Sequence, residues 1–313
     1  MEAALDNLVR LLTLGFPVMV GAVAGWLGVF SEPRRAVDIL NRYALTFGFP
    51  ALIVRGLIEA GEIPSAPAFW LSWPVALGAI LLGIRVLVRS ELAGTIALTS
   101  CFGNVAFLGL PYVLSLYGSA AEGFAALAVS IHVAFAATLG PILLVRWGST
   151  GSVSWRQAMV QVMKMPLVWS PFVGLALGQL PESAQQPITS CIGPIAASAA
   201  PVALFLLGLY LFLERGYLRR FSASLALHVV IRLLVAPTAV ALLVLAAVEL
   251  GWLEPLHARI HIMLASMPAA ITAFSLSHRA NLGQERVAAT VVWSSALALL
   301  LLPLWAWIAG SLL

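Results

Sequence analysis

The sequence predicts an all-α integral membrane protein with ten transmembrane helices, arranged as two inverted five-helix repeats. Three observations predict this fold class: the composition, the number of apolar spans, and the landmarks that the two halves share. Of the 313 residues, 61% are hydrophobic and 10% are charged, and the mean hydropathy is +1.00. A β-barrel would show segments of about ten residues that alternate apolar and polar, and the sequence lacks that alternation.

Apolar spans of about 20 residues, the length of a helix that crosses a bilayer, follow one another along the whole chain. They lie at residues 8–30, 38–60, 68–89, 93–116, 120–146, 157–180, 187–213, 222–249, 258–279 and 287–312. The first five spans form one repeat, 8–147, and the last five form the other, 158–312. The stretch 148–157 contains Gly-Ser-Thr-Gly-Ser and is predicted to be a cytoplasmic linker.

Basic residues lie mainly on one side of the predicted membrane. Thirteen of them fall at the connections between spans 1–2, 3–4, 5–6, 7–8 and 9–10: Arg34, Arg35, Arg42, Arg85, Arg89, Arg146, Arg156, Lys164, Arg215, Arg219, Arg220, Arg279 and Arg286. On the other side only Arg10, Arg55 and Arg259 lie near span ends. Cytoplasmic loops are enriched in Lys and Arg, so we expect an inner-membrane protein with both termini on the non-cytoplasmic side. The basic charge therefore indicates no nucleic-acid partner.

Glycine and proline recur at matching places in the two halves. The matching sets are Pro17, Gly21 and Gly25 with Pro171, Gly174 and Gly178; Pro50 with Pro201; and Pro111 with Pro268. Each half has an odd number of spans, so the second enters the bilayer with opposite polarity and the repeat is inverted. Close helix packing is the favoured interpretation for the glycines of spans one and six. The interruptions in spans four and nine instead predict a transport site.

The fourth span carries the stretch on which the functional prediction depends. Residues 100–112 read Ser-Cys-Phe-Gly-Asn-Val-Ala-Phe-Leu-Gly-Leu-Pro-Tyr, which places Asn104, Gly109 and Pro111 inside an apolar helix. Pro111 has no N–H to donate and its ring clashes with the carbonyl of Phe107. We therefore expect helix breaks at Gly109 and Pro111 in span four and at Pro268 in span nine. A carbonyl freed in this way is tolerated in a membrane only inside protein or beside a wet cavity.

These residues resemble the auxin efflux carrier family, which includes plant PIN-type carriers and bacterial malate and malonate permeases. Residues 103–111, with Leu-Tyr-Gly at 116–118, are similar to the fourth-helix motif of that family, and stretches 201–208, 267–274 and 293–304 resemble its seventh, ninth and tenth helices. The resemblance implies two inverted five-helix repeats, as in bile-acid sodium symporters. It implies a scaffold of helices 1, 2, 6 and 7 with hinge positions at Pro50 and Pro201. Helices 3–5 and 8–10 would form the transport domain, in which the broken helices 4 and 9 cross.

Polar side chains near the predicted crossing are the candidates for binding substrate. They are Asn104 and Thr272, with Ser100 and Ser266 behind them; Thr272 stands where many bacterial members of the family carry Asn. The N-terminal ends of half-helices carry partial positive charge and free N–H groups, which suit a carboxylate. The sequence thus predicts a secondary transporter of a small organic anion, a mono- or dicarboxylate or an auxin-like acid, with elevator-type alternating access.

Among the ionisable residues of the predicted spans, His132, His228 and Arg232 are singled out, because such groups are costly inside a membrane and often functional. His132 is the proton-coupling candidate, because an imidazole titrates in the physiological range; the alternative is a neutral histidine hydrogen-bonded to a neighbour. Arg232 is either a counter-charge for the anionic substrate or a side chain that extends to the cytoplasmic headgroups. His228 lies four residues before Arg232, on the same helical face. Arg55 and Glu59 are expected to form an ion pair.

Several function classes are excluded or left as alternatives. All thirteen acidic residues lie near span ends or in loops, which argues against a buried carboxylate as an ion carrier. The chain has one lysine, Lys164, and hence no Gly-Lys-Ser/Thr phosphate loop. Cys101 and Cys191 indicate neither a disulfide framework nor a metal site. No cofactor is expected apart from a coupling H⁺ or Na⁺.

An enzyme and a channel or sensory module are the two alternatives to a carrier. An enzyme would need His132 or His228 beside Ser130 or Ser294, and no Gly-x-Ser-x-Gly element supports that reading. We therefore expect a non-enzyme. Its expected partners are a small organic anion and the lipid bilayer, and homodimer formation is left open.

Overall fold

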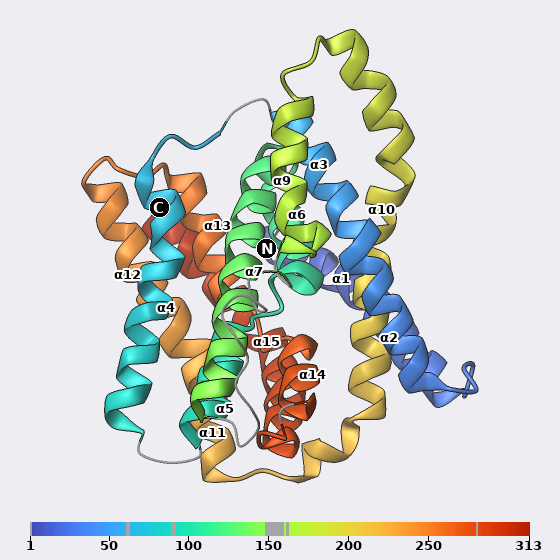
Figure 1. Cartoon of the computed structure of the whole chain (residues 1–313), viewed down its shortest axis with the longest axis vertical. Coiled ribbons are helices and arrows are strands. Elements are labelled where there is room, and N and C mark those ends of the chain that lie inside the picture. The colour runs from blue at the N-terminus through green and yellow to red at the C-terminus, as the bar shows by residue number, and fades with distance from the viewer. Residues whose placement is uncertain (1, 61–62, 89–91, 148–159, 161–162, 280) are drawn as a thin grey trace. The chain divides into compact units, whose positions relative to one another are not determined.

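The computed structural model describes residues 2–60, 63–88, 92–147, 160, 163–279 and 281–313 (Figure 1). The linker predicted at 148–157 lies outside these residues. The chain divides into two compact units: unit 1 is Met1–Ile63, Ala106–Leu127 and Met165–Gly216, and unit 2 is Pro64–Val105, Ala128–Lys164 and Tyr217–Leu313. Unit 1 thus contains the predicted spans one, two and seven, with span six from residue 165 onward, and unit 2 contains spans three, eight, nine and ten. Spans four and five contribute to both.

Six helices of the described chain are long and apolar enough to cross a membrane: Pro33–Ala60, Pro67–Leu87, Ser119–Gly140, Glu182–Leu213, Ala223–Glu249 and Gln284–Leu312. Four further apolar helices, Leu12–Trp26, Leu92–Cys101, Val105–Tyr117 and Pro166–Leu177, have 10–17 residues each. These lengths confirm an all-helical integral membrane protein. The arrangement of ten helices as an inverted repeat stays a prediction.

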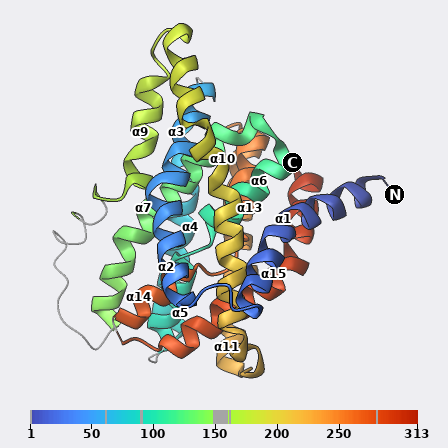
Figure 2. The same cartoon turned by 90° about the vertical axis from the view of Figure 1, so that its right-hand side faces the viewer.

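Unit 1 is built around α10. Its elements are α1 (Glu2–Trp26), α2 (Pro33–Tyr43), η1 (Ala44–Gly48), α3 (Phe49–Ala60), α6 (Leu110–Tyr117), η3 (Ser119–Ala121), α9 (Pro166–Leu177) and α10 (Glu182–Leu213). Both α1 and α3 pack against α10, and α3 also packs against α9. Figure 2 shows α3 running beside α9 and α10.

Glycines let the helices of unit 1 approach one another closely. A Cβ built at Gly21 of α1 would lie 1.9 Å from the carbonyl oxygen of Phe205 in α10, and one built at Gly208 would lie 1.8 Å from that of Val18. A Cβ at Gly174 of α9 would lie 2.9 Å from a side-chain atom of α3. Backbone contact at small residues is the usual way in which membrane helices pack. The glycines of spans one and six therefore serve packing, as predicted.

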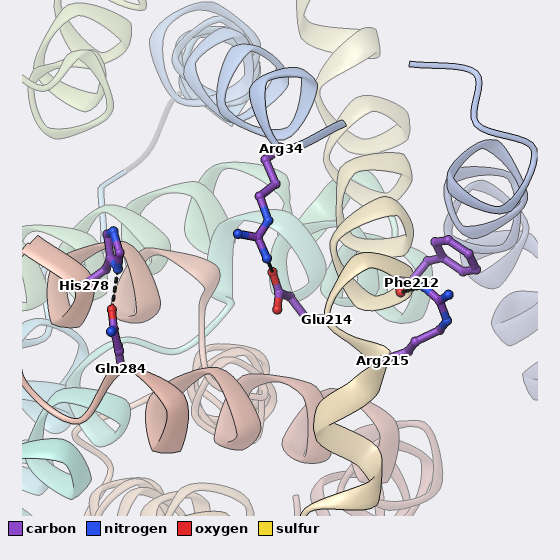
Figure 3. Close-up of polar contacts among 6 residues, drawn as sticks. All are labelled: Arg34, Phe212, Glu214, Arg215, His278 and Gln284. Carbon is purple, nitrogen blue, oxygen red and sulfur yellow. Dashed lines mark hydrogen bonds and ion pairs between the residues drawn. The ribbon is translucent and has the colours of Figure 1, made fainter. Parts of the chain in front are cut away.

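Charged side chains of unit 1 pair near helix ends. Arg55 forms the predicted ion pair with Glu59 at 3.4 Å, and also contacts Glu122, the first residue of α7 (Glu122–Trp147), at 3.4 Å. Arg34 donates to Glu214 at 3.2 Å, and Figure 3 shows this pair joining α2 to the end of α10. Pairs near the surface contribute at most about 1 kcal/mol each.

Unit 2 contains most of α7 and the chain from Tyr217 to Leu313. Its other elements are α4 (Pro67–Leu87), α5 (Leu92–Cys101), α11 (Ala223–Val230), η5 (Ile231–Val235), α12 (Ala236–Glu249), α13 (Pro255–Ala265), α14 (Ile271–Arg279) and α15 (Gln284–Leu312). Helices α4, α12 and α13 pack against one another, and α15 contacts α5, α11, α13 and α14. The short helices η2 (Val105–Gly109) and η4 (Arg215–Arg219) lie where the chain passes from one unit to the other.

In the part of the chain that the structure describes, three segments of π-helix each end two residues before a proline. They are η1, η2 and η5, followed by Pro50, Pro111 and Pro237. A proline clashes with the carbonyl four residues earlier, and a π-turn widens the backbone at that point. For Pro237 that carbonyl belongs to Leu233, and its oxygen accepts a hydrogen bond from Trp305 Nε1 at 3.0 Å. The prolines are thus absorbed without ending these helices.

Candidate functional site

Two helices of unit 2 are interrupted, and their interruptions are joined by backbone hydrogen bonds. Helix α5 ends at Cys101 and α13 ends at Ala265, and α14 begins again at Ile271. Gly103 and Ala269 form an isolated antiparallel bridge. Asn104 N–H donates to the Pro268 carbonyl at 2.7 Å, and Ala270 N–H donates to the Phe102 carbonyl at 2.8 Å. We call residues 100–104 and 266–272 the crossing.

Arg232 lies at the crossing. Its side chain is fully buried; Nε donates to the Met267 carbonyl at 2.7 Å and Nη1 donates to the Ser100 carbonyl at 3.1 Å. A Cβ built at Gly103 would lie 2.1 Å from Arg232 Nη2. Only glycine therefore leaves room for the guanidinium. Of the two roles predicted for Arg232, extension to the headgroups does not fit these bonds.

Three buried polar groups in or beside the crossing have no hydrogen-bond partner among the described residues. They are Asn104 Nδ2, Ser100 Oγ and Arg232 Nη2, on side chains that are 3%, 1% and 0% exposed. A buried polar group without a partner costs about 1–3 kcal/mol. Amide and guanidinium nitrogens are donors only, and a hydroxyl can donate as well. These side chains thus give the crossing unused donors for an acceptor-rich ligand.

The other two predicted binding residues differ from each other. Thr272 is half-buried and is the second residue of α14, so it lies where the first N–H groups of that helix have no acceptor within the helix. Ser266 is buried, and its hydroxyl donates to the Met263 carbonyl of α13 at 2.8 Å. The Ser266 hydroxyl proton is therefore used within its own helix.

The predicted breaks are in part displaced. Pro268 lies in the interruption between α13 and α14, as expected. The expectation for Gly109 and Pro111 is wrong, because Gly109 ends the π-helix η2 and Pro111 lies in the first turn of α6, with helical backbone throughout. Proline is tolerated in a first turn, and η2 accommodates its ring. The interruption in span four lies earlier, at residues 102–104.

His132 belongs to a buried aromatic cluster in unit 2. Its ring stacks on Trp73 with centroids 4.0 Å apart and lies 6.3 Å from His261. Phe69 meets the ring of His261 edge-on at 4.9 Å. His132 and His261 are 2% and 0% exposed, and neither ring nitrogen of His132 has a hydrogen-bond partner among the described residues. The alternative of a hydrogen-bonded His132 therefore finds no support, and His132 stays a proton-coupling prediction.

His228 has a structural place instead. Its Nδ1 hydrogen-bonds the Ser224 carbonyl at 2.6 Å and its Nε2 lies 2.8 Å from Thr95 Oγ1, which joins α11 to α5. Ser294 of α15 accepts a hydrogen bond from Ala269 N–H at 3.1 Å and donates to Val291. Both residues of this pair, which the enzyme alternative would need, thus form hydrogen bonds to other groups.

Sequence reasoning missed three residues that the structure brings to this region: Gly103, Ser294 as an anchor of the crossing, and His261. Gly103 belongs to the quoted motif, but a residue without a side chain gives no sign of what it accommodates. His261 lies inside the predicted ninth span, four residues after His257, and this spacing on one helical face could have revealed it. The role of Ser294 depends on tertiary contact and had no local signal.

An open cavity of about 570 Å³ lies elsewhere in unit 2. It is bounded by the chain from Tyr217 to Leu225 and from Asn281 to Ala289, and includes Arg220 and Arg286. It contains none of the predicted site residues. Arg220 is already paired with Glu285 at 3.2 Å.

Comparison with known proteins identifies the family. The model of the family described as "Membrane transport protein" matches residues 11–306. The chain belongs to this family. The match confirms the resemblance to the auxin efflux carriers and malonate permeases, and with the apolar helices it makes the chain a multi-pass membrane protein.

Curated relatives are similar over nearly their whole length. A Rhizobium meliloti protein named "Putative malonate transporter" is 24% identical over 280 residues, which cover 85% of each chain. A Methanothermobacter thermautotrophicus protein named "Uncharacterized transporter" is 26% identical over 308 residues, 92% of this chain and 93% of its own. A similarly named Methanocaldococcus jannaschii protein is 25% identical over 313 residues, 93% of this chain and 95% of its own.

Proposed function

We propose that this member of the membrane transport protein family is a secondary carrier of a small organic anion, a mono- or dicarboxylate. The observation that carries the proposal is the set of three buried, unpartnered groups at the crossing, Asn104 Nδ2, Ser100 Oγ and Arg232 Nη2. A carboxylate has two acceptor oxygens and no donor when ionised, so it complements such a site. The name of the Rhizobium meliloti relative makes malonate the first substrate to test.

The N-terminus of α14 supports the same ligand. Helix N-termini bind anions because their first N–H groups point outward and the helix dipole is positive there. Thr272 adds a hydroxyl in this first turn. We therefore assign Asn104, Ser100, Arg232 and Thr272 to the substrate, with Ser266 as a neighbour that faces its own helix.

Transport would follow an elevator-type movement of unit 2 as a rigid body. Unit 2 holds every residue assigned to the substrate, and the crossing is internally bonded by its own backbone and by Ser294. A site that belongs to one unit can move with it without being taken apart. Pro50 and Pro201, the predicted hinge positions, both lie in unit 1.

Counterflow of labelled malonate in proteoliposomes tests the carrier. A carrier exchanges external labelled malonate for internal unlabelled malonate, a channel gives no counterflow, and an enzyme alters the compound. Loss of one hydrogen bond to a charged ligand costs about 1.5–3 kcal/mol, so we expect Asn104→Ala to weaken malonate affinity about 10- to 100-fold. Ser311→Ala is the matched control, because Ser311 is exposed and bonds only within α15.

The isosteric variant Asn104→Asp is a stricter test. It replaces the amide donor by a carboxylate, whose negative charge repels an anionic substrate. We expect it to abolish malonate binding while Ser311→Ala binds as the wild type. Wild-type affinity in both Asn104 variants would refute the assigned site, and absence of malonate counterflow in the wild type would refute malonate as the substrate.

We also propose an inner-membrane location with both termini outside the cytoplasm, as the distribution of basic residues predicts. A C-terminal alkaline phosphatase fusion should be active and a C-terminal green fluorescent protein fusion should be dark. The reverse result would overturn this orientation.

A further inference from the structure

An interrupted membrane helix leaves carbonyl groups that a cation can bind. The last four carbonyls of a helix lack intrahelical donors, and the C-terminal end of the helix is the negative end of its dipole. In many secondary carriers with broken helices, unwound carbonyls and half-helix C-terminal ends hold the coupling cation. The interruptions after α5 and α13 create two such ends in unit 2.

In this protein the carbonyls at both ends are bound by one side chain. Arg232 Nε donates to Met267, just after α13, and Nη1 donates to Ser100, in the last turn of α5. A guanidinium remains protonated in proteins and presents its donors in a fixed fork. One side chain thus places a full positive charge between two negative helix ends.

The surroundings of Arg232 show that this charge is held at the crossing. The side chain is 0% exposed, and among the ion pairs of the described residues none involves Arg232. A buried charge is costly unless it is hydrogen-bonded, and here carbonyl dipoles provide those bonds. Gly103 provides the space, since a Cβ there would lie 2.1 Å from Nη2 and 2.9 Å from Cζ.

We infer that Arg232 is a tethered cation that takes the place of a coupling metal ion, so that the protein binds and moves its anion without Na⁺. The Arg232 Nη2 group, which has no partner, supplies the positive charge that a bound cation would otherwise place beside the anion. The inference rests on the proposed carrier function for transport, whereas the occupation of the cation position can be tested without any substrate.

The first experiment measures binding at the cation position. Removal of the side chain in Arg232→Ala should leave a cavity lined by the Met267 and Ser100 carbonyls. We expect millimolar guanidinium or methylguanidinium to raise the apparent Tm of this purified variant saturably, because a ligand of the folded state stabilises it. Choline at equal ionic strength should give no shift. The matched control is Arg220→Ala, whose arginine forms an exposed pair with Glu285, and its Tm should not respond.

Failure of Arg232→Ala to respond to guanidinium more than to choline would overturn the inference. If this variant does not fold, the wild-type protein decides: its Tm should be the same in Na⁺, K⁺ and choline, and a saturable stabilisation by Na⁺ would overturn the inference. Arg232→Lys retains the charge without the fork of donors. Guanidinium should therefore raise its apparent Tm less than that of Arg232→Ala.

The second experiment measures transport. Malonate counterflow by the wild type should change less than twofold when choline replaces Na⁺ on both sides, and a loss of more than tenfold would overturn the inference. In Arg232→Ala we expect at least a tenfold loss, with partial recovery by guanidinium. Absence of counterflow in every medium would instead count against the proposed malonate carrier, and the Tm measurements would still decide whether Arg232 fills a cation position.

Discussion

Gly103→Ala should detach Arg232 from the crossing. The new Cβ would lie 2.1 Å from Arg232 Nη2, whereas ordinary contact begins at 3.4 Å. The guanidinium would have to move by more than 1 Å, which takes its bonds to Met267 and Ser100 from 2.7 and 3.1 Å beyond the usual hydrogen-bond range. Two hydrogen bonds from a charged donor contribute about 1.5–3 kcal/mol each. We therefore expect a destabilisation of about 3–6 kcal/mol.

Thiol labelling during thermal unfolding measures this loss locally. Cys101 is buried at the end of α5 and Cys191 is exposed, so a Cys191→Ser background leaves Cys101 as the reporter. Gly83→Ala in α4 is the control, because a Cβ at Gly83 meets nothing within 4 Å and alanine is favoured over glycine in a helix by roughly 0.5–1 kcal/mol. We expect Cys101 to react at a much lower temperature in Gly103→Ala and at an unchanged or higher one in Gly83→Ala.

A double-mutant cycle identifies the cause. If the clash with Arg232 is responsible, Gly103→Ala should cost little more in an Arg232→Ala background, which gives a large coupling energy. Strictly additive effects, or a Gly103→Ala protein as stable as Gly83→Ala, would refute the reasoning.

Three further predictions concern other contacts of unit 2. Trp305→Phe removes the donor to the Leu233 carbonyl and should cost about 1–3 kcal/mol, which chemical unfolding monitored by circular dichroism would detect; no change would mean that water replaces the indole. Ser294→Ala removes the acceptor of a buried N–H at the crossing and should lower the apparent Tm, and an unaltered Tm would contradict its anchoring role. His132→Gln should abolish the part of malonate uptake that changes with pH, whereas His278→Gln, at an exposed position, should not, and equal profiles would exclude His132 as the coupling group.

The crossing was predictable because its side chains violate the rule for an apolar helix. Asn104 and Pro268 are polar or helix-breaking residues in apolar spans, and both lie in or beside the interruptions that the structure shows. The exact position of the interruption in span four was not predictable from Pro111. A proline can be accommodated by a first turn or by a π-turn, and the choice depends on packing beyond the local sequence.

The direction of the Arg232 side chain could not be derived from the sequence either. The spacing from His228 places both residues on one helical face, yet His228 bonds Thr95 and Ser224 whereas Arg232 bonds the crossing. The Arg232 side chain takes its own direction because it binds carbonyls that the interruptions of α5 and α13 leave free. Those carbonyls come from segments more than thirty positions away in the chain, so no local pattern contains them.

The π-helical segments also affect how faces of these helices are related. A π-turn holds one residue more than an α-turn, and one residue corresponds to a rotation of about 100° around the helix axis. Arg232 lies inside η5, so the faces of α11 and α12 are offset from each other across it. Deletion of Leu234 would restore α-helical register and rotate α11 and α12 relative to each other. Either Arg232 or the buried face of α12 would then leave its present position. Single substitutions at such a segment leave this angular relation intact, whereas a single deletion removes it.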